Sequence, residues 1–539
     1  MTRVSKPWSP SNGFHRNSRW VLAAALALGL GACADSKPAG TIGYVKGFGG
    51  VVAADEPRAA IVGRDVLSAG GSAADAAVAM YFTMAVTLPS TASLGGGGVC
   101  VVHDFDSKTV EVLDFLARPS SVQGAARVET AVPANVRGFY ALYAKYGKTR
   151  WEGLLMEPER LARLGTQASR AFIYDYARSA QMLANDPGAR QVFFPNGRPL
   201  AEGQTIEQYD LAQAISWIRR APGDFYTGTT ARELVNAVTQ AGGTLTAEDL
   251  RAVQPQWVKP IEVKLGNDIA YFAPAPAVGS AVAAQLTSAL ADRWKDVSAD
   301  ERQHLVAETA ARAFAARSQW MRPDGWPKGA ADAAAKPDMV GAAKAGYDPA
   351  RHNPVSADKP TDATQAAGLV VMDSNGNSVA CNVTTYGMFG AGMVAPGTGI
   401  VMAASPGRNT GPAGIAPVLV VNPHVHETHF AAAASGGITA PTALAQVLLG
   451  AQVDGTKLDK AQAAPRVHHS GTPDLAVVEP PEQGGDPSSL AKRGHEVRAV
   501  AIPARVNAFQ CDSGRAGFST CRAESDPRGF GLSAVVGRD

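Results

Sequence analysis

The most restrictive pattern in the sequence is a β-hairpin signal late in the chain. Leu369-Val370-Val371-Met372 forms a short apolar run, and Asp373-Ser374-Asn375-Gly376-Asn377 follows it as a turn segment. Residues 378–385 then return as a second strand-like run. An Asn-Gly pair between two such runs predicts antiparallel strands joined by a tight turn. Helical patterns precede this hairpin and strand-helix units follow it, so the sequence predicts sheets covered by helices on their outer faces.

Length and charge narrow the class of protein. The 539 residues exceed the ~250–300 at which a single core usually stops growing, so two lobes or one very large α/β domain are expected. Hydrophobic residues make up 46% and charged residues 18%, a globular composition. The formal charge is +2, but the first 32 residues hold four basic and no acidic residues, which leaves −2 for the rest. Without a basic stripe, nucleic-acid binding is not expected, and small-molecule chemistry is favoured.

The first 32 residues have the layout of an export signal. Their apolar run, Val21 to Leu30, is 10 residues long and too short to cross a bilayer. The run closes on Leu30-Gly31-Ala32-Cys33, which resembles the bacterial lipobox, where the signal is removed before a cysteine that receives diacylglycerol. An ordinary signal peptide with a chance cysteine is the alternative. The lipobox predicts a soluble domain that faces the periplasm and is anchored through lipid on Cys33, with Ala34 favouring the outer membrane.

Four cysteines follow the predicted lipidation site. Cys511 and Cys521 flank a short polar loop, and an oxidising compartment favours a disulfide between them, although spacing alone does not determine the pairing. Cys100 and Cys381 lie in apolar strand-like runs and are predicted to be buried small hydrophobic residues.

The first half of the chain predicts mainly helices. Pro57 suits the first position of a helix that ends at Gly70-Gly71, and Ser72 caps a second, Ala-rich helix whose uniform apolarity predicts burial. Residues 130–320 are predicted to be mostly helical. Residues 323–363 lack a sustained apolar period and are predicted to form a long exposed loop.

Phosphate-binding, metal-binding and catalytic motifs are incomplete or poorly placed in this sequence. Gly95-Gly96-Gly97-Gly98 lacks the Gly-Lys-Ser/Thr of a phosphate loop. The histidines near residue 426 do not have HExxH spacing and are expected in an exposed turn, and Ser356 to Lys359 has SxxK spacing by chance. No cofactor and no metal site is therefore predicted.

Several segments together resemble the γ-glutamyltransferase (γ-glutamyltranspeptidase) family, in the family's order over roughly residues 46 to 480. The segments that carry the resemblance are GGSAADAAVA (70–79), FFPNGRPLAEGQTIEQYDLA (193–212), DFYTG (224–228), GGTLTAEDL (242–250), APAPAVGS (273–280), DSNGNSVA (373–380), APGTGI (395–400), Ser435-Gly436-Gly437 and APRVHH (464–469). The resemblance implies an α+β fold, the αββα sandwich of N-terminal-nucleophile hydrolases with a largely helical N-terminal lobe.

The resemblance also implies a mechanism. The family's precursor cuts itself into a large and a small chain and so exposes a threonine with a free α-amino group. That amine has a reference pKa of ~7.7–8.0 and can act as general base for the adjacent hydroxyl. Paired backbone amides then hold the oxyanion, which is typically worth ~10²–10³ in rate for one donor. Gly436 and Gly437 match the family's glycine pair, and a tight strand-to-helix turn would want the same glycines.

The sequence departs from the family at the nucleophile. The family's two threonines open the strand seven residues before the aspartate matched by Asp373, where this chain has Ala366-Ala367. The nearest candidate nucleophile is Thr364, which requires the strand to be two residues longer. The family's later threonine, which positions the nucleophile, matches Thr384, but the asparagine two residues further on is Tyr386.

The predicted substrate pocket has changed as well. The family's arginine for the glutamyl α-carboxylate is replaced by Leu116, and Arg118 follows two residues late. Residues 403–408 replace the segment that holds the α-amino group. This arginine and this segment are the family's carboxylate clamp and ammonium clamp. Losing both clamps removes charge-assisted hydrogen bonds worth ~1.5–3 kcal/mol each. Arg118 and Arg408 are candidate anion-binding residues, and solvated surface arginines are the alternative.

These observations predict four regions and two functions. Residues 1–32 are the signal peptide, 33–45 the lipidated tether, 46–363 a large-subunit-like region and 364–539 a small-subunit-like region. The leading prediction is an autoprocessed enzyme that hydrolyses or transfers an amide or γ-glutamyl group through Thr364, with the substrate altered. The alternative is an uncleaved, inactive family member that binds a small molecule. The oligomeric state is left open.

Overall fold

The computed structural model describes residues 49–122, 124, 127–322, 326–357, 365–407, 412–514 and 520–537. They belong to one compact unit, Gly47–Asp539. The predicted signal and tether, including Cys33, lie outside the described residues, as do Thr364 and Arg408. Among the helices that the structure describes, none is both long and apolar enough to cross a membrane.

Two antiparallel sheets form the centre of the unit. The seven-stranded sheet has the order β22 (Leu532–Val536), β1 (Gly50–Ala54), β11 (Gln365–Asp373), β12 (Ser378–Tyr386), β2 (Gly97–Asp104), β3 (Thr109–Phe115) and β8 (Gln256–Val258). The six-stranded sheet has the order β21 (Cys521–Glu524), β20 (Arg505–Cys511), β16 (Glu427–Ser435), β15 (Ala416–Asn422), β10 (Asp268–Phe272) and β9 (Ile261–Leu265). Each sheet takes strands from both predicted regions, 46–363 and 364–539.

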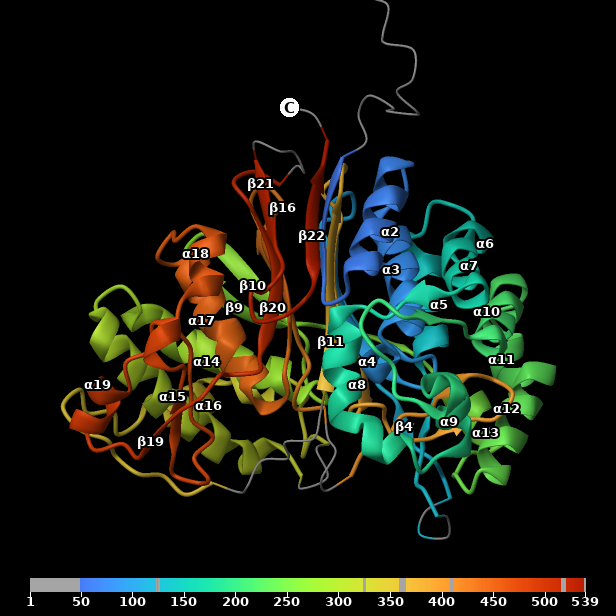
Figure 1. The fold of residues 1–539 in the computed structure, drawn as a ribbon. Coiled ribbons are helices and arrows are strands. Elements are labelled where there is room, and N and C mark those ends of the chain that lie inside the picture. Colours follow the sequence, from blue (N-terminus) through green and yellow to red (C-terminus); the bar gives the residue numbers. More distant parts are fainter. Residues whose placement is uncertain are drawn as a thin grey trace, which may run out of the picture. The chain divides into compact units, whose positions relative to one another are not determined.

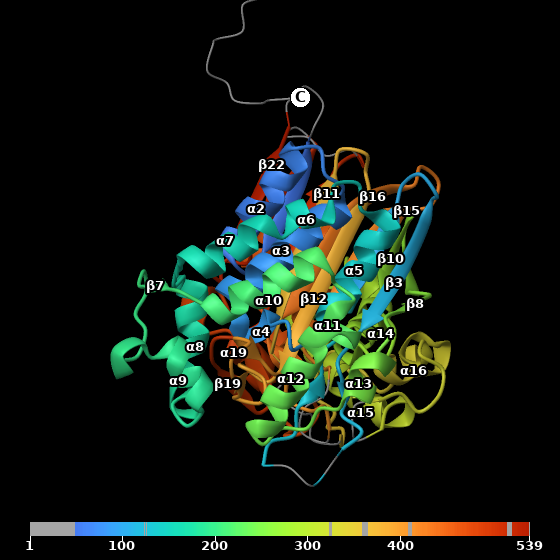
Figure 2. The ribbon, with the colours of Figure 1, turned by 90° about the vertical axis from the view of Figure 1, so that its right-hand side faces the viewer.

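Helices cover the outer face of each sheet, which makes a four-layered αββα sandwich (Figures 1 and 2). The helices on the side of the seven-stranded sheet are α2 (Pro57–Ser68), α3 (Ala73–Thr87), α4 (Pro89–Ala92), α5 (Asn135–Tyr146), α6 (Trp151–Leu154), α7 (Met156–Leu164), α8 (Arg170–Leu183), α9 (Pro187–Phe193), α10 (Tyr209–Arg220), α11 (Asp224–Thr227), α12 (Thr229–Gln240) and α13 (Ala247–Ala252). The other side has α14 (Val278–Leu290), α15 (Ala299–Trp320), α16 (Pro337–Lys344), α17 (Ala440–Gln452), α18 (Leu458–Ala463) and α19 (Pro487–Lys492).

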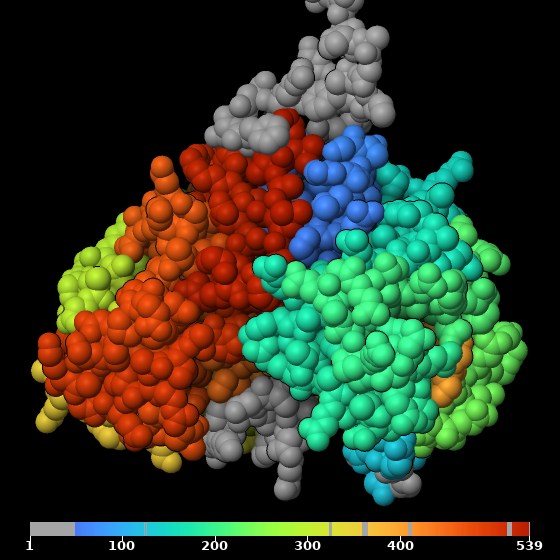
Figure 3. Space-filling view, viewed as in Figure 1, coloured from blue at the N-terminus to red at the C-terminus, as the bar shows by residue number. Residues whose placement is uncertain are grey.

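Short elements complete the described structure. The 3₁₀ turns are Pro195–Gly197, Ala291–Arg293, Ala333–Ala335, η4 (Gly437–Thr439) and Pro481–Gln483. The small sheets pair β4 (Arg118–Pro119) with β5 (Ala131–Val132), β6 (Thr166–Gln167) with β7 (Thr205–Ile206), β13 (Val394–Ala395) with β14 (Ile400–Val401), and β17 (Val467–His468) with β18 (Ala476–Val478) and β19 (Val497–Ala499). In Figure 3, the teal and green helices lie mainly on the right of the visible face, and the orange-to-red C-terminal elements lie mainly on the left and at the top centre.

The predicted hairpin lies at the middle of the seven-stranded sheet. β11 and β12 pair as the Asn-Gly turn requires, with Leu369 opposite Cys381. The turn also anchors a helix, because the Asp373 carboxylate accepts a hydrogen bond from the Ala73 N–H at 3.1 Å, at the start of α3. The predicted Ser72 cap of α3 is present as a capping box with Asp75. Local signals therefore determined both the hairpin and the buried helix that packs on it.

Both of these cysteine pairs form disulfides in the structure. Cys511 and Cys521 lie opposite each other on β20 and β21 and are joined. Cys100 and Cys381 are fully buried, as expected, but they are also joined, so the prediction of unpaired cysteines was wrong. They are separated by 281 residues and become directly opposed only when β2 pairs with β12.

Two other local predictions need correction. Within the predicted loop 323–363, the structure has the helix α16 and the preceding 3₁₀ turn Ala333–Ala335, and partly buried apolar residues of both pack on the core beside α14. The mostly helical region 130–320 also contains β8, β9 and β10, which contribute to both sheets. β9 has the alternating burial of a strand with one face on the core, a period-2 signal that was overlooked.

The glycine run at 95–98 has a packing role. A Cβ on Gly96 would lie 2.3 Å from the Thr384 carbonyl oxygen, and one on Gly97 would lie 2.1 Å from the Ala117 amide nitrogen. Glycine is therefore needed where β2 approaches the backbones of β12 and the segment after β3.

Candidate active site

The start of β11 presents an alanine to the space between the two sheets. Ala366 is fully buried in the core between the sheets, whereas Ala367 packs in the core beneath the helices around α3. Side chains alternate between the two faces of a strand, which explains the split. The position that the sequence matches to the family's nucleophile therefore carries a methyl group on the inward face.

Thr384 holds the backbone next to that position. It lies opposite Ala366 in the β11–β12 ladder, and the register shifts between Gln365 and Ala366. Its hydroxyl donates to the Gln365 carbonyl oxygen at 2.5 Å and accepts from the Tyr386 N–H at 2.8 Å. Thr384 thus contacts the carbonyl of the peptide bond immediately before Ala366.

The predicted glycine pair forms the turn between β16 and α17. Gly436 has a φ of 114° and Gly437 a φ of 66°, both in the left-handed region. A Cβ on Gly436 would lie 2.4 Å from the Ala504 Cα, so this turn requires glycine. In the described part of the chain, neither amide N–H donates to another residue. Two adjacent free amides in such a turn can hold an oxyanion or a carboxylate oxygen.

A buried ion pair connects the glycine turn to β11. The Asp55 carboxylate accepts from the Gly368 N–H at 2.7 Å and from the Ser435 hydroxyl at 3.1 Å. The Arg505 Nε lies 3.5 Å from Asp55. Burial opposes the Arg505 cation, but the negative charges of Asp55 and Asp175 outweigh it and raise the pKa of the guanidinium. This network fixes the residue before Gly436 relative to the strand that carries Ala366.

Tyr386 lies against two segments that the sequence matches to the family's substrate pocket. Its ring is fully buried among Ala117, Ala131 and Ala403, and its hydroxyl donates to the Ala117 carbonyl oxygen at 2.6 Å. Burial raises the pKa of the phenol, which therefore remains a donor. The tyrosine thus spans from the segment after β3 to the start of the segment 403–408.

Arg118 already has partners. Its guanidinium donates to the Asp114 carboxylate at 2.8 Å, and its Cζ lies 4.2 Å from the centroid of the Trp326 ring. Burial raises the pKa of Asp114, and the charge of Arg118 opposes that rise. With 41% of its side chain exposed, Arg118 is at the edge of this region. The structure therefore brings Thr384, Ala366 and Arg118 to neighbouring segments, with the glycine pair linked through Asp55.

Sequence reasoning missed a histidine cluster in the other half of the molecule. His352, His469 and His495 come together there, beside His304 and Glu308. Their spacing along the chain matches no compact metal motif, because each lies on a different segment. His469 belongs to the segment APRVHH, which was used only for the family resemblance.

The sandwich and its paired glycines define an N-terminal-nucleophile hydrolase fold. The family model for gamma-glutamyltranspeptidase matches residues 59–405 and 403–536. The chain therefore belongs to the γ-glutamyltranspeptidase family, and this membership supports a hydrolase or transferase function.

Relatives in bacteria match along most of their length. The glutathione hydrolase proenzyme of Escherichia coli is 26% identical, with 91% of this chain and 94% of that protein covered. The proenzyme of Pseudomonas aeruginosa is 27% identical, with 96% of this chain and 99% of that protein covered. Among solved structures, cephalosporin acylase from Bacillus halodurans superposes with a TM-score of 0.76 at 22% identity, with 93% and 98% covered. The γ-glutamyltranspeptidase of Helicobacter pylori has a TM-score of 0.51 at 24% identity, with 56% of this chain and 92% of that structure covered.

Proposed function

We propose that this protein is an uncut member of the γ-glutamyltranspeptidase family that binds a small acyl compound instead of hydrolysing it. The observation that carries the proposal is Ala366. Its methyl group occupies the inward-facing position that carries the nucleophile in the family, and alanine has no atom that can attack a carbonyl. Without self-cleavage there is also no free α-amino group to act as base.

Tyr386 supports a changed ligand. The family's carboxylate clamp and ammonium clamp map to Leu116 and to residues 403–408, and the buried tyrosine ring packs against Ala117 and Ala403 at these two places. An aromatic ring there takes space next to both lost clamps. Among Leu116, Ala117, Tyr386 and Ala403 to Gly407 there is no acidic side chain to pair with an α-ammonium group, so a compound without a free α-amino group fits better.

The unpartnered amides of Gly436 and Gly437 support retained binding. Buried donors without acceptors are costly, so a turn that keeps two free N–H groups favours a ligand oxygen. A carbonyl or carboxylate oxygen of an amide or acyl compound has the right chemistry. These two donors define the end of the ligand that would face the glycine turn.

Purified full-length protein tests this proposal directly. After long incubation, intact mass and N-terminal sequencing are expected to find one uncut chain. The same preparation should release no product from a chromogenic γ-glutamyl anilide, while calorimetry with N-acyl amino acids as probes detects heat of binding. Two fragments, or turnover of the anilide, would overturn the proposal of an uncut binder, and no binding of any probe would overturn its ligand class.

A second candidate function is hydrolysis or acyl transfer by Thr364. It is favoured by the retained contact of Thr384 with the backbone before Ala366 and by the glycine pair. Residues two apart in a strand face the same side about 6.6 Å apart, so β11 would have to shift by two residues along β12. In the experiment above, a new N-terminus at Thr364 would identify this function.

We also propose that the mature chain is a periplasm-facing lipoprotein. The basic opening, the apolar run and Leu30-Gly31-Ala32-Cys33 support it. A Cys33→Ala variant is expected to lose the diacylglycerol mass from its N-terminal peptide and to leave the membrane fraction, because the lipid on Cys33 is the proposed anchor. Equal membrane recovery of the wild type and the variant would contradict a lipid anchor on Cys33.

A further inference from the structure

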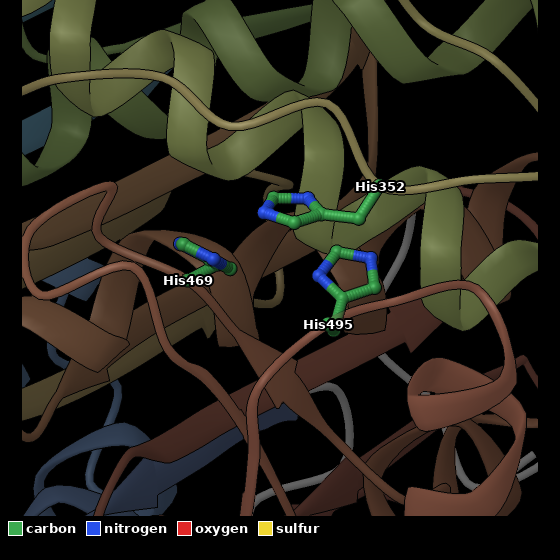
Figure 4. Close-up of side chains that lie close together, drawn as sticks. All are labelled: His352, His469 and His495. Atoms are coloured by element: carbon green, nitrogen blue, oxygen red, sulfur yellow. The ribbon is translucent and has the colours of Figure 1, made fainter.

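The histidine cluster has the features of a built site. His352, His469 and His495 point a ring nitrogen toward one another (Figure 4), and candidate ligand atoms of the three lie within 4.8 Å of each other. The side chains are 7%, 1% and 0% exposed. Three imidazoles from three separate segments are thus buried side by side.

Hydrogen bonds around the cluster set the protonation of two rings. His304 Nε2 lies 2.9 Å from the Asp348 carbonyl oxygen, to which only an N–H can bind, so its Nδ1 accepts. His495 Nε2 lies 2.8 Å from that Nδ1 and therefore donates. The lone pair of His495 is then on Nδ1, which is buried and has no protein partner. In the same way, the Glu308 carboxylate holds the Nδ1 of His352 at 2.5 Å and leaves its Nε2 to face the cluster.

Asp474 supplies an oxygen to the same space. Its Oδ1 lies 3.1 Å from His352 Nε2 and 3.3 Å from His469 Nε2. In a tetrahedral zinc site with bonds of about 2.0–2.1 Å, ligand atoms lie about 3.3–3.4 Å apart. These two separations are close to that value, whereas the candidate ligand atoms of the three histidines lie within 4.8 Å of one another. A carboxylate opposite an imidazole lone pair also requires a positive charge between them, either a proton or a cation.

We propose that His352 Nε2, His469 Nε2, His495 Nδ1 and Asp474 bind one Zn²⁺ ion. Three imidazoles and one carboxylate match the ligands that zinc prefers, and four protein ligands make a closed, structural site. Glu308, behind His352, is the outer carboxylate that metal-bound histidines commonly use to orient the ring.

One hydrogen bond must change when the ion binds. His469 Nδ1 accepts from the Gly471 N–H at 3.0 Å, which places the ring proton on Nε2. Coordination through Nε2 moves this proton to Nδ1 and breaks the contact with Gly471. Asp474, whose side chain is 41% exposed, gives the ion a route from solvent.

The site would act as a clip between distant segments. His352 lies on the segment that leads to β11, and its N–H donates to the Arg493 carbonyl oxygen at 2.5 Å. Further along the segment, the Ala357 N–H donates to the Thr472 hydroxyl at 3.2 Å. Zinc would add a stronger tie between this segment and the loops of His469 and His495. It requires neither self-cleavage nor ligand binding in the cleft.

Zinc binding is tested on full-length protein purified without a histidine tag. The protein is treated with EDTA, freed of chelator and titrated with ZnSO₄, and bound metal is measured by mass spectrometry after desalting. One Zn²⁺ per chain and a higher midpoint of thermal unfolding are expected. His352→Gln and Asp474→Asn should each weaken binding by at least about 10–100-fold, since even outer partners of metal ligands have effects of that size.

His429→Gln is the matched control. His429 also contacts a carboxylate, Asp268 at 3.0 Å, but lies outside the cluster, so this variant should bind zinc as the wild type does. With Co²⁺ in place of Zn²⁺, the wild type should show the visible absorption bands of a tetrahedral site, and Asp474→Asn should not. The Asp474 side chain is partly exposed, so this substitution leaves the core intact. A wild type that binds no zinc, or variants that bind it equally well, would overturn the proposal.

Discussion

The variant Ala366→Thr is expected to cut itself between residues 365 and 366. The new hydroxyl would lie on the inward face of β11, next to the Gln365 carbonyl, which the Thr384 hydroxyl already holds at 2.5 Å. Attack by this oxygen on the Gln365 carbonyl carbon breaks the C–N bond, forms an ester and frees the amine of residue 366. Water then hydrolyses the ester and leaves a carboxylate on Gln365. Intact mass and N-terminal sequencing over several days measure this reaction.

Two further variants test whether cleavage depends on the inward-facing hydroxyl and on Thr384. Ala367→Thr adds the same group on the opposite face of the strand, among the residues beneath α3, and is expected to remain uncut. Thr384→Ala in the Ala366→Thr background removes the donor to the carbonyl oxygen and should slow cleavage by roughly 10²–10³. A folded Ala366→Thr protein that stays intact would mean that the missing hydroxyl is not what prevents cleavage.

Asp526→Ala is expected to reduce the free energy of unfolding by about 3–5 kcal/mol, the usual cost of leaving a buried charge unpaired. The Asp526 carboxylate lies 2.5 Å from the Arg466 guanidinium, and the two side chains are 0% and 2% exposed. Burial lowers the pKa of Arg466, and Asp526 is the first of the charges that oppose this effect. Urea unfolding followed by circular dichroism measures the loss.

The same ion pair supports the glycine turn. Arg466 also donates to the Ala504 carbonyl oxygen at 2.7 Å, and Ala504 is the residue against which Gly436 packs. As a control, Asp459→Ala removes an exposed partner of Lys460 and should change stability by about 1 kcal/mol or less. Equal effects of Asp526→Ala and Asp459→Ala would contradict a strong buried pair.

Local patterns explain which elements were predicted correctly. The Asn375-Gly376 turn and the Ser72 cap depend on residues within a few positions of each other, and both are present. α16 was missed because a helix of eight residues is too short to show a clear apolar period, and it is stabilised by packing on α14 rather than by its own sequence. The strand β9 was overlooked beside helical neighbours, although its alternation was readable.

Some features of the candidate site could likewise be predicted from the sequence, and others could not. The absence of the family's threonines at Ala366-Ala367 can be read from the sequence, and the structure adds that Ala366 faces the space between the sheets. The contact of Tyr386 with Ala117 and Ala403 could not be read, since it joins segments far apart in the chain. Thr364 and Arg408 lie outside the described residues.

The sequence by itself determined the family, the hairpin and the glycine turn, and it predicted alanines at the position of the family's nucleophile, because each of these is encoded in a contiguous segment. Only the tertiary structure decided which distant side chains meet. The Cys100–Cys381 disulfide and the cluster of His352, His469 and His495 are examples. Residue type and periodicity specify backbone conformation and burial, whereas the partner of a buried side chain depends on how the sheets and helices pack.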